Sequence, residues 1–335
     1  MNYFLALAFS LCLGQAFCQK PIIIGTSQSI QSSVLKESRN LLVYSPAPDK
    51  ASKVRYPVLY LLDGPAFFEA YTGMVRYLSA CGKMPQLIVV GIANTDRVRD
   101  LTPTHATQWS DGENDPAALG TSGGGEAFTR FLADELMPHI DSLYPTAPYR
   151  ILMGHSLAGL LTLNTLLKHP SLFNAYVTID PSLWWDHHAL LKQVGAEIDR
   201  ADYPTKKLFF ASANTLANGM DTSRVEADTA KANGHVRDNL QFRQILAGSK
   251  RNQLTCTWKY YPDDNHTSVP FIAGYDAMRA LFKGYELPKE LTDPELNAAF
   301  LRQHYKSVSM MLGYEVLPPE STVNLLGYEQ LSRKQ

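Results

Sequence analysis

The sequence predicts an α/β protein in which a mostly parallel central sheet is flanked by helices. Two observations support this fold class. Apolar runs of strand length alternate with helical patterns along the chain, and most of these runs are continuously apolar. Continuous apolar runs are typical of strands buried on both faces, and a β-then-α order is typical of a doubly wound sheet. The 335 residues, 45% of them hydrophobic, suffice for one large domain and exclude a disordered chain.

Six runs are predicted to be strands: Val58–Asp63, Leu87–Ala93, Arg150–Gly154, Ala175–Asp180, Lys207–Ala213 and Thr255–Tyr261. Four helical patterns lie between them: Glu126–Leu143, Leu157–Lys168, His235–Leu246 and Phe271–Phe282. The stretch Ser32–Ser45 adds one or two strands, expected to be antiparallel at the sheet edge. The connections Asn94–Gly125 and Pro181–Thr205 are long, and α/β proteins build their sites on such connections.

The chain divides into three segments: residues 1–18, a predicted signal peptide; residues 19–287, the main domain; and residues 288–335, a short helical C-terminal extension. Tyr3–Phe17 is almost wholly apolar and uncharged, but too short to cross a bilayer comfortably. A small-residue cleavage pattern ends at Cys18. We therefore expect a periplasmic or secreted protein without stable membrane insertion, with an uncleaved anchor as the alternative.

The extension is predicted to form a helix that packs on the main domain. Thr292 or Asp293 can cap it, Pro294 suits its first turn, and Gly313 lies past its end. Apolar residues recur within it at helical spacing: Ala298, Leu301, Tyr305, Val308 and Leu312.

Charge and cysteine content narrow the function classes. The chain has 31 basic and 32 acidic residues and no basic run, which argues against a nucleic-acid partner. After cleavage two cysteines would remain, Cys81 and Cys256. Two cysteines are not a disulfide framework, and the sequence leaves their pairing open.

The nucleophile candidate is Ser156. It lies in the segment GHSLAG, residues 154–159, which is close to the Gly-x-Ser-x-Gly motif and connects a predicted strand directly to a predicted helix. A serine on such a sharp turn projects its hydroxyl from the sheet. The alternative is a tight turn with a capping serine. A second motif match, residues 120–124, has no strand before it and is interpreted as a flexible connection.

The base candidate is His266, because it opens the loop between the last predicted strand and the last predicted helix of the main domain. A serine hydroxyl needs such a base to take its proton, and in this fold class the order along the chain is serine, acid, histidine. Other histidines suit helix ends, the tail or a pocket lining: His169, His187, His188, His235 and His304. His187 and His188 lack a third ligand at useful spacing, so no metal site is expected.

The acid is the least determined member of the site. It is expected after the strand Lys207–Ala213, and Asp221 is the first carboxylate beyond that strand. Glu226 and Asp228 follow closely, and Asp180 at the end of the preceding strand is a further option. Asp221 is preferred, and the alternatives stay open.

Five stretches together resemble the "Putative esterase" family of α/β-hydrolases: residues 56–64, 96–104, 154–159, 180–186 and 264–270. This family includes esterase D-type, siderophore-trilactone, feruloyl and acetyl-xylan esterases and mycolyltransferases. The resemblance covers about residues 30 to 285 and implies an α/β-hydrolase fold. It also implies a two-donor oxyanion hole, with one donor the Leu157 N–H and the other from the loop at Gly64 or Ala66. Pro65 departs from this pattern, because proline has no N–H to donate.

The substrate pocket is expected to include Trp184 and Trp185, which would form a stacking surface for an aromatic or sugar group. The alternative is that one of them fills the core and only the other faces the pocket. Arg99, with Arg97, would bind a carboxylate or catecholate, unless it pairs with neighbouring aspartates.

These features predict an exported serine esterase that uses no metal or organic cofactor. Ser156 attacks an ester carbonyl, His266 is base and then acid, and Asp221 orients His266. The expected partner is a small-molecule or carbohydrate-linked ester, such as a feruloyl ester or a siderophore trilactone. The alternatives are acyl transfer to an alcohol and a non-catalytic binding protein on an esterase scaffold.

Overall fold

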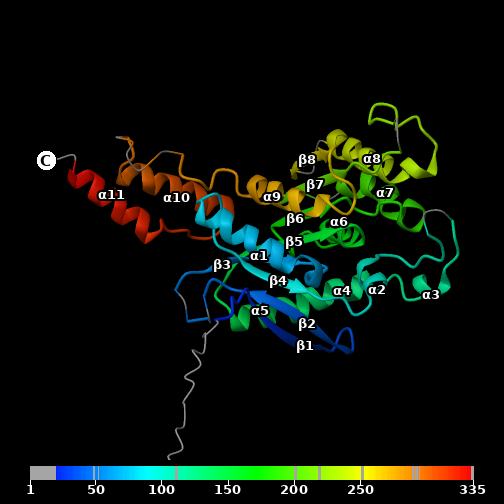
Figure 1. Cartoon of the computed structure of the whole chain (residues 1–335), viewed down its shortest axis with the longest axis horizontal. Coiled ribbons are helices and arrows are strands. Elements are labelled where there is room, and N and C mark those ends of the chain that lie inside the picture. Colours follow the sequence, from blue (N-terminus) through cyan, green and yellow to red (C-terminus); the bar gives the residue numbers. More distant parts are fainter. Residues whose placement is uncertain are drawn as a thin grey trace, which may run out of the picture.

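The computed structural model describes residues 20–47, 50–51, 53–109, 112–199, 202–217, 220–249, 253–288, 290, 293 and 295–332 (Figure 1). Its centre is one eight-stranded sheet in the order β1-β2-β4-β3-β5-β6-β7-β8. The strands are β1 (Thr26–Ser32), β2 (Glu37–Tyr44), β3 (Tyr56–Leu61), β4 (Ile88–Ile92), β5 (Thr146–His155), β6 (Ala175–Ile179), β7 (Lys207–Ala213) and β8 (Thr255–Tyr261).

The sheet is mixed only at one edge. β1 and β2 form an antiparallel hairpin, β2 runs antiparallel to β4, and every pair from β4 to β8 is parallel. This confirms the predicted mostly parallel sheet with antiparallel strands at its edge. Because the parallel strands point the same way, the connections that follow them gather at one end of the sheet.

The helices are α1 (Gly64–Ala80), α2 (Arg97–Leu101), α3 (Pro116–Leu119), α4 (Gly125–Phe131), α5 (Met137–Leu143), α6 (Leu157–Lys168), α7 (Trp185–Ile198), α8 (Gly234–Gly248), α9 (Val269–Leu281), α10 (Ala298–Leu312) and α11 (Glu320–Ser332). A π-helical turn, Leu132–Leu136, joins α4 to α5, and a 3-10 turn, Lys231–Asn233, precedes α8.

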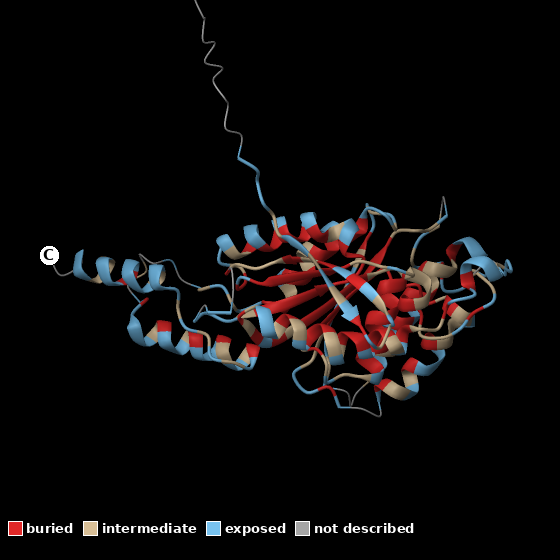
Figure 2. Ribbon diagram, turned by 90° about the horizontal axis from the view of Figure 1, so that it is seen from below, coloured by how far each residue is buried: buried red, intermediate tan, exposed pale blue. Residues whose placement is uncertain are grey.

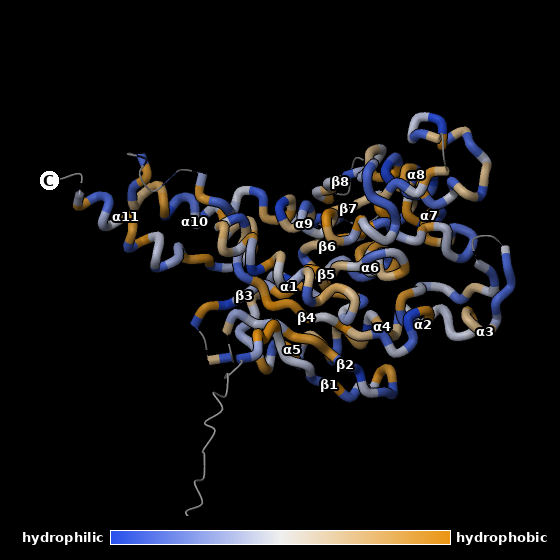
Figure 3. The backbone as a smooth tube through the Cα atoms, in the orientation of Figure 1, coloured by the Kyte–Doolittle hydropathy of each residue, from blue (hydrophilic) through white to orange (hydrophobic). Residues whose placement is uncertain are grey.

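Helices cover both faces of the sheet, as the continuous apolar strands predict. On β3, Val58 and Tyr60 face a core layer that includes side chains of α4, α5, α6, α7 and α8. Leu59 and Leu61 face the opposite layer, which includes side chains of α1, α9 and α10. Figure 2 shows the central strands buried between exposed outer helix surfaces, whereas the edge strands β1 and β8 are largely exposed. Figure 3 shows the hydrophobic strands at the centre.

The predicted elements match best where an apolar run has sharp ends. β7, β8 and α6 have the predicted bounds. Two long helices were not predicted: α1, which starts directly after β3, and α7, which lies inside the connection Pro181–Thr205.

The C-terminal extension contains two helices, and Figure 1 shows both at the end of the molecule opposite α3 and α8. Val308 and Leu312 of α10 join the core layer of α1 and α9, so this helix packs on the main domain as predicted. Gly313 has φ 73° and ends α10 as predicted. The start differs: Asn297 caps the helix through its side chain, whereas Thr292 and Pro294 lie outside the described residues.

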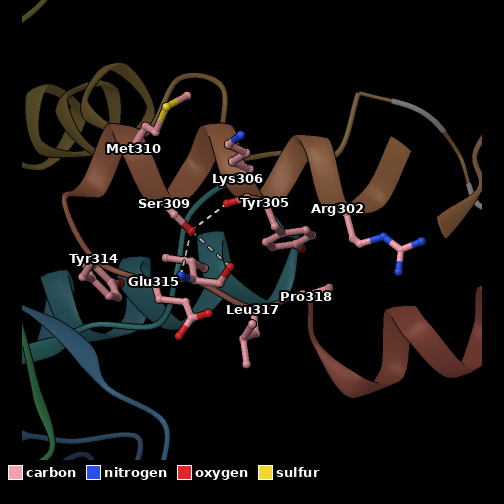
Figure 4. A pocket seen from close by; sticks show the side chains of 10 residues that line it. Arg302, Tyr305, Lys306, Ser309, Met310, Tyr314, Glu315, Leu317 and Pro318 are labelled. Carbon is pink, nitrogen blue, oxygen red and sulfur yellow. Dashed lines mark hydrogen bonds between the residues drawn. The ribbon is translucent and has the colours of Figure 1, made fainter. Parts of the chain in front are cut away.

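A cavity of about 570 Å³ lies beside α10, at the connection to α11 (Figure 4). Ser309 holds this connection, because its hydroxyl donates to Tyr305 O at 2.7 Å and accepts from Val316 N–H at 2.8 Å. The cavity belongs to the extension and is remote from the connections at the other end of the sheet.

No helix among the described residues is long and apolar enough to cross a membrane. The predicted signal peptide, residues 1–18, lies outside the described residues. Cys81 and Cys256 are both free and exposed, so they are not paired with each other in this structure.

Candidate active site

Ser156 lies on the turn between β5 and α6, where its backbone has φ 62° and ψ −120°. A positive φ is strained for a residue with a side chain, and it turns the chain sharply from strand to helix. The Ser156 N–H donates to Ile179 O at 3.0 Å, and Ser182 N–H donates to Ser156 O at 3.2 Å. The strand–turn–helix setting predicted for this serine is confirmed.

Two glycines make the turn possible. A Cβ on Gly154 would lie 2.3 Å from Ala158 O, and one on Gly159 would lie 3.0 Å from Thr178 Oγ1. Ala158 stands where Gly-x-Ser-x-Gly has its second glycine, and it is fully buried. The close approach of β6 to α6 is therefore carried by Gly159, one position later.

The second motif match is a loop, as predicted. It follows α3 rather than a strand, and Gly123 within it has φ 95°. The buried Ser122 hydroxyl donates to Leu119 O at 2.6 Å and accepts from Ala106 N–H at 3.1 Å. These bonds tie the connection together.

His266 pairs with Asp180. His266 Nδ1 lies 2.6 Å from Asp180 Oδ2, which joins the loop after β8 to the end of β6. Asp180 is fully buried and has φ 44°. An imidazole held in this way presents its other nitrogen, Nε2, as a base.

The Asp180 carboxylate is held from several elements at once. Oδ1 accepts from Ala213 N–H at 3.0 Å and from Asn239 Nδ2 at 3.4 Å, and Oδ2 also lies 2.9 Å from His235 Nε2. Burial acts to raise the pKa of Asp180, but the charge and close contact of His235 and the hydrogen bonds from His266 and Ala213 N–H outweigh it. The pKa therefore lies well below its usual range, and the carboxylate stays charged.

The structure does not bring Asp221 to His266. Asp221 is exposed, and its carboxylate binds Ser223 and Arg224 in its own turn. The strand Lys207–Ala213 contributes the Ala213 N–H to the site and no acid. The carboxylate that contacts His266 is Asp180, which the sequence offered as a further option.

The Ser156 hydroxyl faces Ser182. The two Oγ atoms are 3.1 Å apart, and among the hydrogen bonds of the described residues this is the side-chain contact of Ser156. Ser182 is buried on the connection after β6. In this resting arrangement the Ser156 hydroxyl is not bonded to His266.

His155 lies between Ser156 and the second core layer. Its ring centroid is 4.5 Å from that of His266 and 6.2 Å from that of Phe67. Burial lowers the pKa of His155 to about 4, and the nearby charge of His266 acts in the same direction. A neutral imidazole therefore packs against His266 at neutral pH.

The two oxyanion candidates lie at helix starts. Leu157 is the first residue of α6 and Gly64 the first of α1, and first-turn N–H groups have no partner within their helix. Ala66 N–H donates to Asp63 O at 3.0 Å, so it is already used. A Cβ on Gly64 would lie 2.5 Å from Gly91 C, which fixes this turn tightly against β4.

Both arginines near the site are engaged in ion pairs. Arg97 binds both oxygens of Asp63, at 2.8 and 2.9 Å. Arg99 binds Asp100 at 2.8 Å and Glu37 at 2.7 Å. Arg99 therefore has the structural pairing that the sequence offered as the alternative.

The two tryptophans have different roles. Trp185 is 1% exposed and donates from Nε1 to Thr104 O at 3.0 Å, so it fills the core. Trp184 is partly exposed, and its ring centroid is 6.3 Å from that of Trp109. Trp109 and Trp184 line a cavity of about 160 Å³, together with polar side chains that include Asp186, His187, His188 and Lys231.

The backbone of this cavity is strained. Asp186, His187 and His188 have φ of 47°, 51° and 63°, three left-handed residues in succession. Each such residue costs about 1–3 kcal/mol, and strain of this kind gathers at functional sites. His188 Nδ1 lies 3.1 Å from Asp238 Oδ2, which ties the segment to α8.

Asp180, His235 and His266 are the one group among the described residues whose ligand-type atoms lie close enough for a metal, within 4.8 Å. Both nitrogens already contact the same carboxylate oxygen. The His266 contact is a hydrogen bond and the His235 contact is a close ion-pair contact, so we assign no metal to the group.

A serine on a strained strand-to-helix turn at the carboxyl end of such a mixed sheet is characteristic of α/β-hydrolases. Residues 32–268 match the family model described as "Putative esterase", which is more than two thirds of the chain. The chain therefore belongs to this family of esterases, and its fold is that of the family's hydrolases.

Several curated relatives are named as siderophore esterases. The siderophore enterobactin esterase of Emericella nidulans is 29% identical over 267 residues, 70% of this chain and 84% of that protein. The ferri-bacillibactin esterase BesA of Bacillus subtilis is 31% identical over 186 residues, 51% of this chain and 63% of that protein. A solved structure of an IroE-like serine hydrolase from Shewanella oneidensis has 32% identity and a TM-score of 0.78, covering 92% of this chain and 95% of that one.

Proposed function

We propose that the protein is a serine esterase that cleaves carboxylic ester bonds in a siderophore. The observation that carries the proposal is the 2.6 Å contact between His266 Nδ1 and the buried carboxylate of Asp180, next to the serine elbow. The family match and the siderophore esterases among the relatives support the reaction class and the substrate class.

The reaction begins with the Ser156 hydroxyl turning from Ser182 towards His266. His266 Nε2 accepts the hydroxyl proton as Ser156 Oγ attacks the ester carbonyl carbon, and Asp180 stabilises the imidazolium that forms. His266 then gives this proton to the leaving alcohol. The remaining acyl-enzyme is hydrolysed by a water that His266 activates in the same way.

The negative oxygen of the tetrahedral intermediate needs hydrogen-bond donors. Leu157 N–H at the start of α6 is the first, and Gly64 N–H at the start of α1 is the second. The loop offers two candidate donors, Gly64 and Ala66, because Pro65 between them has no N–H. Ala66 N–H is bonded to Asp63 O, so Gly64 N–H is the remaining donor. Both donors lie at helix N-termini, whose dipoles favour a negative oxygen.

The cavity at Trp184 suits one arm of such a substrate. Trp109 and Trp184 offer ring surfaces to an aromatic group, and His187 and Lys231 offer donors to its oxygens. Ser182 contacts Ser156 and is two residues from Trp184, so an arm held in this cavity lies near the nucleophile.

Labelling with a fluorophosphonate probe, read by intact mass and peptide mapping, tests the reaction class. We expect one adduct on Ser156, absent in Ser156→Ala and strongly slowed in His266→Ala. His304→Ala is the matched control, because that histidine lies in α10 and contacts Tyr285 O. A panel of trilactone, feruloyl and acetyl esters then ranks the substrate classes. A folded protein without adduct would instead support ligand binding without catalysis.

We also propose that residues 1–18 direct export and are removed. The mass of the protein recovered from the periplasm or medium tests this. A chain that starts at Gln19 is the expected result, and a full-length chain held in the membrane fraction would contradict it.

A further inference from the structure

His235, in the first turn of α8, is a second imidazole on the carboxylate that pairs with His266. Its Nε2 lies 2.9 Å from Asp180 Oδ2, and His266 Nδ1 lies 2.6 Å from the same oxygen. The two ring centroids are 5.2 Å apart and the ring planes are nearly perpendicular, at 88°. The mechanism above uses His266 and leaves His235 without a role.

The first turn of α8 is built around this contact. Asn239 Nδ2 donates to His235 O at 3.0 Å and lies 3.4 Å from Asp180 Oδ1. Asn239 is fully buried. One side chain therefore links the backbone of His235 to the other oxygen of the same carboxylate, so α8 holds both carboxylate oxygens.

The contact is poorly screened by solvent. Asp180 is fully buried, and the His235 side chain is 17% exposed. Three titratable groups from different elements lie within the electrostatic influence of Asp180. They are His266 from the loop after β8, Tyr260 from β8 and His155 from β5. The His235 imidazole at Oδ2 therefore changes how much negative charge Asp180 presents to His266.

We propose that His235 is a positioning residue of the esterase reaction, whose imidazole lies against Asp180 Oδ2 and partly neutralises the carboxylate that orients His266. The inference rests on the function proposed above. Without this imidazole, Asp180 presents more negative charge to His266 and favours its protonated form. The base is then lost at a higher pH than in the natural protein.

Steady-state hydrolysis of p-nitrophenyl acetate between pH 5 and 9 tests the role of His235. We expect His235→Phe, which keeps a ring but no polar nitrogen, to lower kcat/KM roughly tenfold at pH 7, the size of effect that follows the loss of one polar contact with a charged group. The loss falls on kcat, and the acid limb of the profile moves to higher pH. His235→Gln keeps an N–H donor and is expected to restore the limb and most of the rate. His304→Gln, on α10, is the control.

Two results would overturn the proposal. One is an acid limb at the wild-type position in His235→Phe. The other is equal damage in the Gln and Phe variants together with a lowered Tm, which would mean that His235 only fills space.

A second measurement does not depend on turnover. The Nδ1–H proton of His266 is followed by NMR in Ser156→Ala, with and without His235→Phe. We expect its resonance to move when His235 is replaced by Phe and to return with Gln. An unmoved resonance overturns the positioning role. The variants could show this NMR change while the wild-type protein takes no fluorophosphonate. That result would refute the esterase reaction and leave the contact between His235 and Asp180 in place.

Discussion

The hydroxyl oxygens of Ser156 and Ser182 lie 3.1 Å apart, so the proposed nucleophile contacts a neighbouring serine and not His266. Catalytic hydrogen bonds are often absent or long before substrate binds and form in the complex. The resting contact competes with the bond to His266 that the reaction needs.

Replacing Ser182 by alanine removes this competitor. We expect Ser182→Ala to speed fluorophosphonate labelling of Ser156 by a few-fold, because a neutral hydrogen bond contributes about 0.5–1.5 kcal/mol. The pseudo-first-order labelling rate measures the effect. Ser307→Ala on the exposed side of α10 is the control. A tenfold slower reaction would show that Ser182 helps the nucleophile.

The identity of the acid is tested by a pair of substitutions. Asp180→Asn is expected to lower kcat on the order of 10⁴-fold, the loss seen when a triad aspartate becomes an amide, because His266 loses the partner that sets its tautomer. Asp221→Asn is the matched control, since that carboxylate is exposed and bound within its own turn. The ester hydrolysis rate of Asp221→Asn should stay near the wild-type value. The reverse outcome would return the role to Asp221.

Stability should depend on pH through His155. The folded pKa of about 4 lies below the ordinary 6.5, so the unfolded chain binds the extra proton first and stability is lost as pH falls from about 6.5 to 4. Between pH 7 and pH 5 this amounts to about 2 kcal/mol. Urea unfolding of wild type and His155→Gln at both pH values measures the difference. Equal losses in the two proteins would show that His155 is not responsible.

Gly154 of the elbow and Gly195 of α7 differ sharply in the side chain that they tolerate. In Gly154→Ala the new methyl would lie 2.3 Å from Ala158 O, and we expect a loss of at least about 2 kcal/mol of stability. Gly195→Ala is the control, because its Cβ would lie 3.8 Å from Ile245 Cγ2 within a helix. Alanine should be neutral or stabilising there, by up to about 1 kcal/mol. Thermal unfolding of the two variants side by side checks both expectations.

The elements of this fold were readable because local signals agreed. The run around β5, the turn at Ser156 and the apolar start of α6 all lie within about twenty residues. α7 was missed because its first turn is not a regular helix: Asp186, His187 and His188 are left-handed, a conformation in which Asp and His are enriched. The start of α7 therefore carries no ordinary helix-start signal in the sequence.

The acid was harder to place because its surroundings are assembled through space. Asp180 gains its partners from the end of β7, the start of α8 and the loop after β8, three segments far apart in sequence. Asp221 had the expected position along the chain, but it lies in an exposed turn. The signal that could have found Asp180 is its place directly after a buried strand, one strand earlier than expected.

The placement of the extension has a practical side. Figure 1 shows α10 and α11 at one end of the molecule and α3, α7 and α8 at the other. A support, reporter or carrier joined behind α11 would therefore stand at the end of the molecule opposite α7, whose first residues line the cavity at Trp184. An immobilised form of the protein should leave that cavity open to solvent.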